Sequence, residues 1–426
     1  MTDSSELLPN NVAVTSDCLF NLKPSAVRSR SYRASIYPTN KSTFSPSDVA
    51  ILYVPGGRRS TYLDPQQTYL RMTVKNMDGT NPMTVDNNGS SFINRADLFH
   101  GGSLLESIQA YNVLYAYIMD IQANSSQRAG LSTMYGFGAD GGREGIALAS
   151  ATPSVTFCMP LLGVLGLGSD KMIPIGALKD DLRLELTFEN LISSVVYPTG
   201  ATNWQITDLE LELQIIEMSD EGESLIREAT PYDRPVFLHT NSWRHYVSSY
   251  TPAIGNFVTL VPARFASLKT IVLLPRRNID AVAAGFTISA RVNPNFATVN
   301  YRIGSSIVPN KFIVLENSNT TAGFAEGFAE TMKSWHALNT SIFAGVLTST
   351  VYNARDTALA GTVIGAATGT EANTYNLGFC LAIELESFAQ RSDILLSGVN
   401  TLSSQVFFEA NVITAATSGA YAEAAL

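Results

Sequence analysis

The chain has 426 residues, a formal net charge of −9 and a pI near 5.1, and 45% of its residues are hydrophobic whereas only 15% are charged. Soluble domains usually carry about 25% charged residues, so this composition excludes a disordered protein and disfavours one that wraps nucleic acid through many Lys and Arg side chains. The length predicts about two to four domains, and the scarcity of charge predicts a subunit that hides more surface than a lone monomer does.

The N-terminus, Met1–Glu6, lacks a basic stretch followed by an apolar run, so we expect no signal peptide. We expect an N-terminal arm over residues 1–31. After it, β-rich runs alternate with clusters of Gly, Pro, Asn and Asp, a pattern typical of strands and turns. The predicted strands are Tyr32–Tyr37, Tyr69–Lys75, Val155–Met159, Phe257–Val261, Leu268–Leu274, Phe379–Leu385 and Val406–Ile413.

Two further segments alternate strictly between apolar and charged residues. Asp181–Glu189 and Asp208–Ile215 place Leu, Phe or Ile at every second position and mostly charged side chains between them. This period of two predicts strands with one buried face and one face toward water or a partner.

Helical patterning is confined to three short segments, Val113–Ile121, Glu223–Glu228 and Phe324–Leu338. The last segment places Phe324, Phe328, Met332 and Trp335 on one helix face. The chain is therefore predicted to be predominantly β.

Three pairs of short segments recur in the same order at similar offsets. Glu185-Leu186 matches Glu384-Leu385, Glu212–Ile216 matches Glu409–Ile413, and Gly102–Leu105 matches Gly304–Ile307, at offsets of 199, 197 and 202 residues. The repetition predicts two similar β-domains.

Two domains of this length fit an all-β fold of two consecutive eight-stranded jelly-roll sandwiches with a few short helices. The predicted boundaries are a first jelly roll over 32–218, a linker with a short helix over 219–235, a second jelly roll over 236–415 and a C-terminal tail over 416–426. In such a fold the last alternating strand of each domain pairs with strands from its beginning.

The sequence offers no recognisable apparatus for catalysis, cofactor binding or metal binding. Cys18, Cys158 and Cys380 are too far apart for a zinc motif or a disulfide framework, which fits synthesis in the reducing interior of a cell. The Gly136–Gly141 segment spells GxGxxG, but Gly142–Gly145 follows where a dinucleotide site needs a helix, so we interpret it as a loop.

The four histidines, His100, His239, His245 and His336, form no metal-binding motif. His239 and His245 fall on one predicted strand, on the same face but about 20 Å apart. We therefore expect no catalytic, cofactor-binding or metal-binding residues and no cofactor.

Four acidic residues, Glu185, Glu189, Glu210 and Glu212, raise the alternative of a β-sandwich glycosidase with paired carboxylates. Their regular alternation with leucine favours a solvated or interface face instead, and the chain has only three Trp residues to stack on sugars. We predict that the protein is not an enzyme.

Basic residues form small clusters only: Arg28, Arg30 and Arg33 near the N-terminus, Arg58-Arg59, and Arg276-Arg277. An arm that contacts nucleic acid or lipid headgroups weakly is one interpretation of the first cluster. Ordinary ion-paired or solvated arginines are the other.

Four segments, within two successive sandwich-like domains, resemble a known protein family in their residue patterns and in their architecture. They are Phe92–Phe99, Gly102–Ile108, Lys179–Leu186 and Tyr301–Gly304. With them, residues 25–415 resemble the double jelly-roll major capsid proteins of tailless icosahedral DNA viruses, a group that includes virophages and polinton-like viruses.

The resemblance implies a structural protein of the virion that forms homotrimers. Each trimer would be a pseudo-hexameric capsomer that tiles an icosahedral shell beside neighbouring capsomers and minor or penton proteins. It implies no small-molecule substrate, and it places the N-terminal arm beneath the shell, near the genome or an internal membrane, or against a neighbour. Two alternatives stay open: a capsid protein with one shell jelly roll and a protruding domain, and a sandwich-type carbohydrate-binding or adhesion protein.

Overall fold

A computed structural model describes residues 26–425 except 58–59, 81, 143, 151–153, 170, 190–195, 198–202, 230–237, 251–254, 278–288, 290, 292, 294–295, 316–323, 339–345, 348–351, 353–377, 387–396 and 413–420.

Eight strands of the N-terminal half form two facing antiparallel sheets. One sheet has the order β1 (Ser29–Ile36), β11 (Trp204–Met218), β3 (Thr61–Asn76), β8 (Ser154–Pro160), and the other β2 (Val49–Val54), β9 (Leu182–Phe188), β5 (Ile93–His100), β6 (Ser103–Gln109).

This strand order interleaves early and late strands, as a jelly roll requires. β9 lies between β2 and β5, and β11 lies between β1 and β3. The prediction that the last strand of the first domain pairs with its earliest strands is confirmed.

The second half repeats this arrangement strand for strand. Its first sheet has the order β12 (His245–Tyr250), β20 (Tyr421–Ala425), β14 (Thr270–Leu273), β18 (Leu381–Glu384), with β15 (Arg276–Arg277) paired to β20, and its second sheet has the order β13 (Gly255–Val261), β19 (Val406–Val412), β16 (Phe296–Ile303), β17 (Ser306–Val314). The predicted all-β fold of two jelly rolls is confirmed.

The equivalence corrects two of the three sequence matches. The Gly102 and Gly304 segments do occupy equivalent turns, between β5 and β6 and between β16 and β17. However, the strand equivalent to β9, which carries Glu185, is β19 rather than β18, and the strand equivalent to β11, which carries Glu212, is β20 rather than β19. Alternating Glu and apolar residues occur on any half-buried strand, so they do not identify equivalent ones.

The prediction of a C-terminal tail over residues 416–426 is also wrong, because the last strand of the second jelly roll lies within that range. Residues 421–425 form β20, which pairs with β12, β14 and β15. The predicted arm also overlaps the first jelly roll, since β1 begins at Ser29, while residues 1–25 lie outside the described part of the chain.

Helices and a small sheet complete the fold. The three predicted helices are found as α1 (Tyr111–Gln122), α4 (Asp220–Ala229) and α5 (Ala325–Ser334). The remaining elements are α2 (Ser125–Tyr135), the short helices η3 (Gly89–Phe92) and η4 (Ile175–Ala177), and a sheet of β10 (Val196–Tyr197), β4 (Met83–Asp86) and β7 (Glu144–Leu148). Among the described helices, none combines the length and apolar character needed to cross a membrane.

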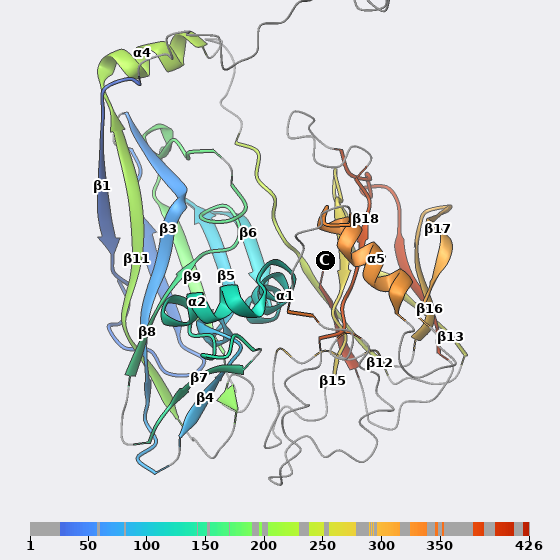
Figure 1. The fold of residues 1–426 in the computed structure, drawn as a ribbon. Helices are drawn as coiled ribbons and strands as arrows, with labels where there is room; N and C mark the ends of the chain where they lie inside the picture. The colour runs from blue at the N-terminus through green and yellow to red at the C-terminus, as the bar shows by residue number, and fades with distance from the viewer. Residues whose placement is uncertain are drawn as a thin grey trace, which may run out of the picture.

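Local chemistry explains where these elements form. In β9 every second side chain is buried, from Leu182 to Phe188, as the alternation predicts. α2 begins with a capping box between Asn124 and Gln127 and ends at Gly136, whose φ of +80° suits glycine. α1 is buried along nearly its whole length and lies between the two sandwiches (Figure 1).

Candidate functional site

Three charged side chains are fully buried where the two jelly rolls meet. Asp120 on α1 accepts a hydrogen bond at 2.6 Å from Arg128 on α2 through Oδ1, and one from Arg291 of the second half through Oδ2. Neither the carboxylate nor either guanidinium is exposed. Since a buried charge is costly unless it is paired, these contacts link the two halves through ion pairs whose loss would leave a charge buried without a counter-charge.

Further polar contacts surround the cluster. Nε1 of Trp335, at the end of α5, donates to the hydroxyl of Tyr117 on α1 at 2.8 Å. Asp86 at the end of β4 accepts hydrogen bonds from Ser289 Oγ at 2.6 Å and from its backbone N–H at 3.0 Å. We call Asp86, Tyr117, Asp120, Arg128, Ser289, Arg291 and Trp335 the inter-roll seam. It joins the two jelly rolls through oriented hydrogen bonds and ion pairs.

The second jelly roll presents apolar side chains on its outer sheet. Figure 1 places β13, β16 and β17 on the side away from the first jelly roll. There Val258 and Leu260 are 53% and 50% exposed, and Ile307, Phe312 and Val314 are also exposed. We call these five residues the outer apolar face. A group of exposed apolar residues on one sheet marks a surface suited to protein–protein contact.

A polar pair lies beside the outer apolar face. Nε of Arg302 donates to Glu409 at 2.7 Å, and the Arg302 guanidinium lies 4.6 Å from the ring centre of Phe407. β16 and β19, which carry these residues, lie between β13 and β17 in the sheet. The outer surface of this sheet therefore has exposed apolar side chains on its edge strands, β13 and β17, and an ion pair on its two central strands.

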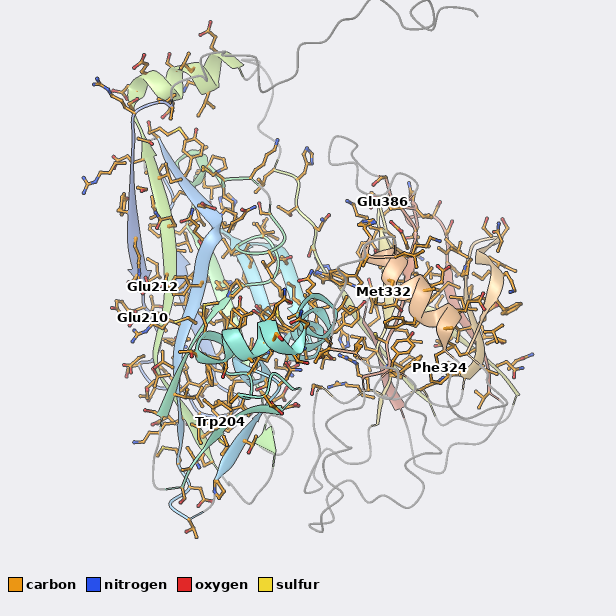
Figure 2. All side chains as sticks on the ribbon, in the orientation of Figure 1. Trp204, Glu210, Glu212, Phe324, Met332 and Glu386 are labelled. Carbon is orange, nitrogen blue, oxygen red and sulfur yellow. The ribbon has the colours of Figure 1, made fainter. Side chains whose placement is uncertain are left out.

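The structure does not assemble the four acidic candidates into a glycosidase site. Glu210 pairs with Arg71 at 2.8 Å, and Glu185 pairs with Arg183 at 3.0 Å. Figure 2 shows Glu210 and Glu212 on the side of the first jelly roll away from the second. Glu185, Glu210 and Glu212 are each paired with an arginine side chain.

The prediction of a solvated or interface face is wrong for two of these four residues. The Glu212 side chain is 1% exposed, because Arg33 and Ser35 of the adjacent β1 donate to it. The hydrogen bond from Arg33 holds the pKa of Glu212 below its usual value. Glu189 is also buried and accepts hydrogen bonds from Asn94 at 2.8 Å and Asn112 at 3.0 Å.

Two other sequence motifs take ordinary structural places. The Gly136–Gly141 segment is a loop between α2 and β7, as predicted. His239 lies outside any strand, and β12 begins at His245, so the prediction that both lie on one strand is wrong.

The basic clusters do not form one continuous surface. Arg33 is paired with Glu212, Arg30 lies over the ring of Tyr32, and Arg276 and Arg277 form the short strand β15, which pairs with β20. Arg58-Arg59 lies outside the described residues.

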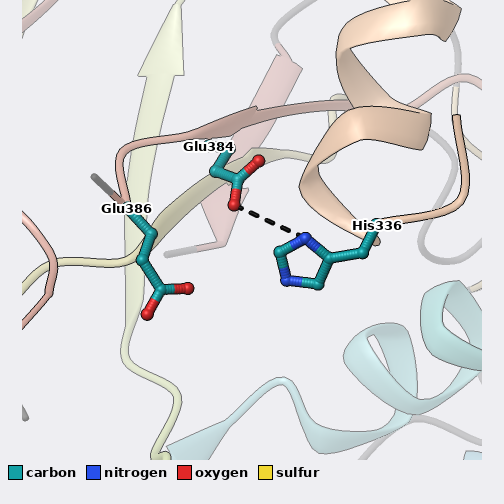
Figure 3. Close-up of side chains that lie close together, drawn as sticks. All are labelled: His336, Glu384 and Glu386. Atoms are coloured by element: carbon teal, nitrogen blue, oxygen red, sulfur yellow. Dashed lines mark ion pairs between the residues drawn. The ribbon is translucent and has the colours of Figure 1, made fainter. Parts of the chain in front are cut away.

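One cluster of metal-binding residue types was missed by the sequence analysis. His336 follows α5, Glu384 ends β18 and Glu386 follows it, and their ligand atoms lie within 4.8 Å of one another (Figure 3). The two segments are far apart in the sequence, so no spacing motif connects them. Only the packing of α5 on β18 brings them together.

No protein-family model matches the chain, and no curated protein matches it either. Solved structures do. The Faustovirus major capsid protein is 10% identical, with 96% of this chain and 90% of that chain covered and a TM-score of 0.61. VP54 of PBCV-1, from a structure fitted into a reconstruction of the virophage Sputnik, is 9% identical, with 95% of both chains covered and a TM-score of 0.56.

A chain of the PBCV-1 capsid model is also 9% identical, with 95% of both chains covered and a TM-score of 0.54. These matches extend over both jelly rolls and not over one half alone. The chain therefore has the double jelly-roll fold of these major capsid proteins.

Proposed function

We propose that this chain is a major capsid protein that builds the shell of an icosahedral virion. The carrying observation is the duplication: two jelly rolls with identical strand order, joined through a buried polar seam, in a chain whose fold matches viral major capsid proteins over 95–96% of its length. Because the two halves are equivalent, they favour a double jelly roll and argue against the alternative of one shell jelly roll with a protruding domain.

The proposed building block is a homotrimer. Three copies of two similar sandwiches supply six blocks around a three-fold axis, which gives a pseudo-hexameric outline suited to tiling a facet. A closed three-fold ring needs a head-to-tail interface, in which different surfaces of neighbouring copies meet. The outer apolar face lies at one end of the molecule and the sheet of β1 and β11 at the other, which suits such a ring.

The remaining partners follow from this role. Capsomers would contact one another and the minor or penton proteins at the vertices, and the N-terminal arm would reach the genome or an internal membrane beneath the shell. The proposal includes no enzymatic activity and no small-molecule substrate. Turnover of a glycoside by the purified protein, lost in Glu212→Gln, would contradict that part.

The assembly experiment tests the central claim. Light scattering of the purified protein should give a mass near three times 45.9 kDa or a much larger shell. Electron microscopy should then show hexagonal blocks or closed particles. A monomer that persists at high concentration, with neither blocks nor shells, contradicts the proposal.

A further inference from the structure

We propose that His336, Glu384 and Glu386 bind a divalent transition-metal cation, with Zn²⁺ as the expected ion. One imidazole nitrogen and two carboxylates are a ligand set that suits Zn²⁺ and its first-row neighbours. The proposal concerns the second jelly roll alone and does not depend on the capsid role.

The His336–Glu384 pair has the separation that such an ion needs, and the three ligand atoms lie within 4.8 Å of one another. Two ligands on a tetrahedral zinc ion, each bonded at about 2.0–2.2 Å, lie about 3.3–3.6 Å apart. Nδ1 of His336 and Oε1 of Glu384 are 3.6 Å apart, too long for a hydrogen bond but suited to a shared cation. Figure 3 shows the imidazole and this carboxylate facing each other, with Glu386 beside them.

A second observation points to a ligand here. The Glu384 side chain is only 8% exposed, and its Oε1 is buried with no hydrogen bond among the described residues; its contact at 3.6 Å with His336 is an ion pair only when the imidazole is protonated. A buried carboxylate oxygen without a partner is costly. A bound cation would supply the missing interaction.

The framework around the ligands is fixed by packing. The Thr331 hydroxyl of α5 accepts a hydrogen bond at 3.1 Å from the backbone N–H of Ala382 in β18, and the backbone N–H of His336 donates to the Lys333 carbonyl at 2.9 Å. The helix end and the strand end therefore hold His336 and Glu384 in place, while Glu386 follows the strand.

The charged groups around the cluster carry a net negative charge, which favours binding of a dication. Nζ of Lys269 lies 3.3 Å from Glu386, whose carboxylate also accepts a hydrogen bond from Ser397, and Lys333 and Glu330 pair with each other nearby. Two carboxylates against one lysine leave one negative charge unbalanced when the imidazole is neutral. Lys269 is the competitor that a metal ion must displace.

Zinc titration of the purified, chelator-treated full chain tests the proposal. The wild type should bind one Zn²⁺ per chain by isothermal titration calorimetry. Glu384→Gln and His336→Asn should each weaken that affinity at least about tenfold. Asn suits position 336 because the φ of His336 is +54°, a conformation that Asn tolerates. Co²⁺ loaded in place of Zn²⁺ should show visible ligand-field bands that change in His336→Asn.

A gain-of-affinity variant separates lost ligation from misfolding. Lys269→Gln removes the cation that competes for Glu386 and should tighten Zn²⁺ binding severalfold, which no folding defect would produce. Glu326→Gln, at the other end of α5, is the matched control and should leave the affinity unchanged. Absence of stoichiometric uptake, or uptake unaltered by Glu384→Gln and His336→Asn, overturns the proposal.

Discussion

Asp120 of the first jelly roll and Arg291 of the second form an ion pair in which neither side chain is exposed. Asp120 also pairs with Arg128, so one carboxylate holds two guanidinium groups. The pair joins residues that are 171 positions apart in the chain. Buried ion pairs therefore contribute to the contact between the two jelly rolls, in addition to apolar packing.

Replacing Asp120 with Asn should lower the free energy of unfolding by about 3–5 kcal/mol, because both arginines lose their buried counter-charge. Urea denaturation followed by tryptophan fluorescence measures the change. Asp48→Asn, which removes the exposed pair with Lys41, is the control and should cost less than about 1 kcal/mol. Equal effects of the two substitutions would contradict the role given to the seam.

Tyr117→Phe should destabilise the protein by about 1 kcal/mol, since it removes the acceptor for Nε1 of Trp335. Tyr301→Phe is the matched control: Tyr301 is also buried, but its hydroxyl has no hydrogen-bond partner within the described part of the chain. That substitution should be neutral or stabilising in the same denaturation assay. A larger loss at Tyr301 than at Tyr117 would be inconsistent with the seam.

Leu260→Lys should abolish trimers and shells while it leaves the fold of the subunit intact. The charge would lie in the centre of a desolvated contact if the outer apolar face packs against a neighbouring copy. Light scattering reports the mass, and circular dichroism reports the retained β structure. Leu402→Lys, also at an exposed leucine but outside this face, should assemble normally; assembly by both variants would exclude the outer apolar face as the interface.

Stability should fall with decreasing pH partly through Glu212. Arg33 lowers the pKa of Glu212 in the folded state, so its contribution is present above the ordinary glutamate value of 4.5 and is lost as the pH falls below it toward the folded-state pKa. Glu212→Gln should reduce the acid sensitivity of the denaturation midpoint as the pH falls below 4.5. Glu185→Gln on β9 serves as the comparison, and an identical pH profile for the Glu212 variant and the wild type would refute this assignment.

The sequence predicted nine of the sixteen jelly-roll strands and three of the α-helices that the structure describes, because their signals are local. The strands that it did not predict are β2, β5, β6, β12, β16, β17 and β20. β9 and β11 follow from alternation, and α5 follows from the spacing of Phe324, Phe328, Met332 and Trp335. Figure 2 shows Phe324 and Met332 along α5 in the second jelly roll. Both side chains are buried, as that spacing predicts.

The register of the repeat could not be predicted, because similar Glu and Leu patterns occur on strands that are not equivalent. β20 was missed since Tyr421–Ala425 is short and rich in alanine, and only its pairing between β12 and β14 makes it a strand. The inter-roll seam and the His336 cluster were missed for a related reason. Asp120 and Arg291, like His336 and Glu384, meet only after distant elements pack together.

The position of β20 near the end of the chain also determines when each jelly roll can fold during synthesis on the ribosome. Every strand of the first jelly roll has been synthesised by Met218, so that half can fold while the rest of the chain is still being made. The second jelly roll must wait for residues 421–425, which fill the gap between β12 and β14. A product truncated before these residues would expose two unpaired strand edges, so incomplete chains would be prone to aggregate.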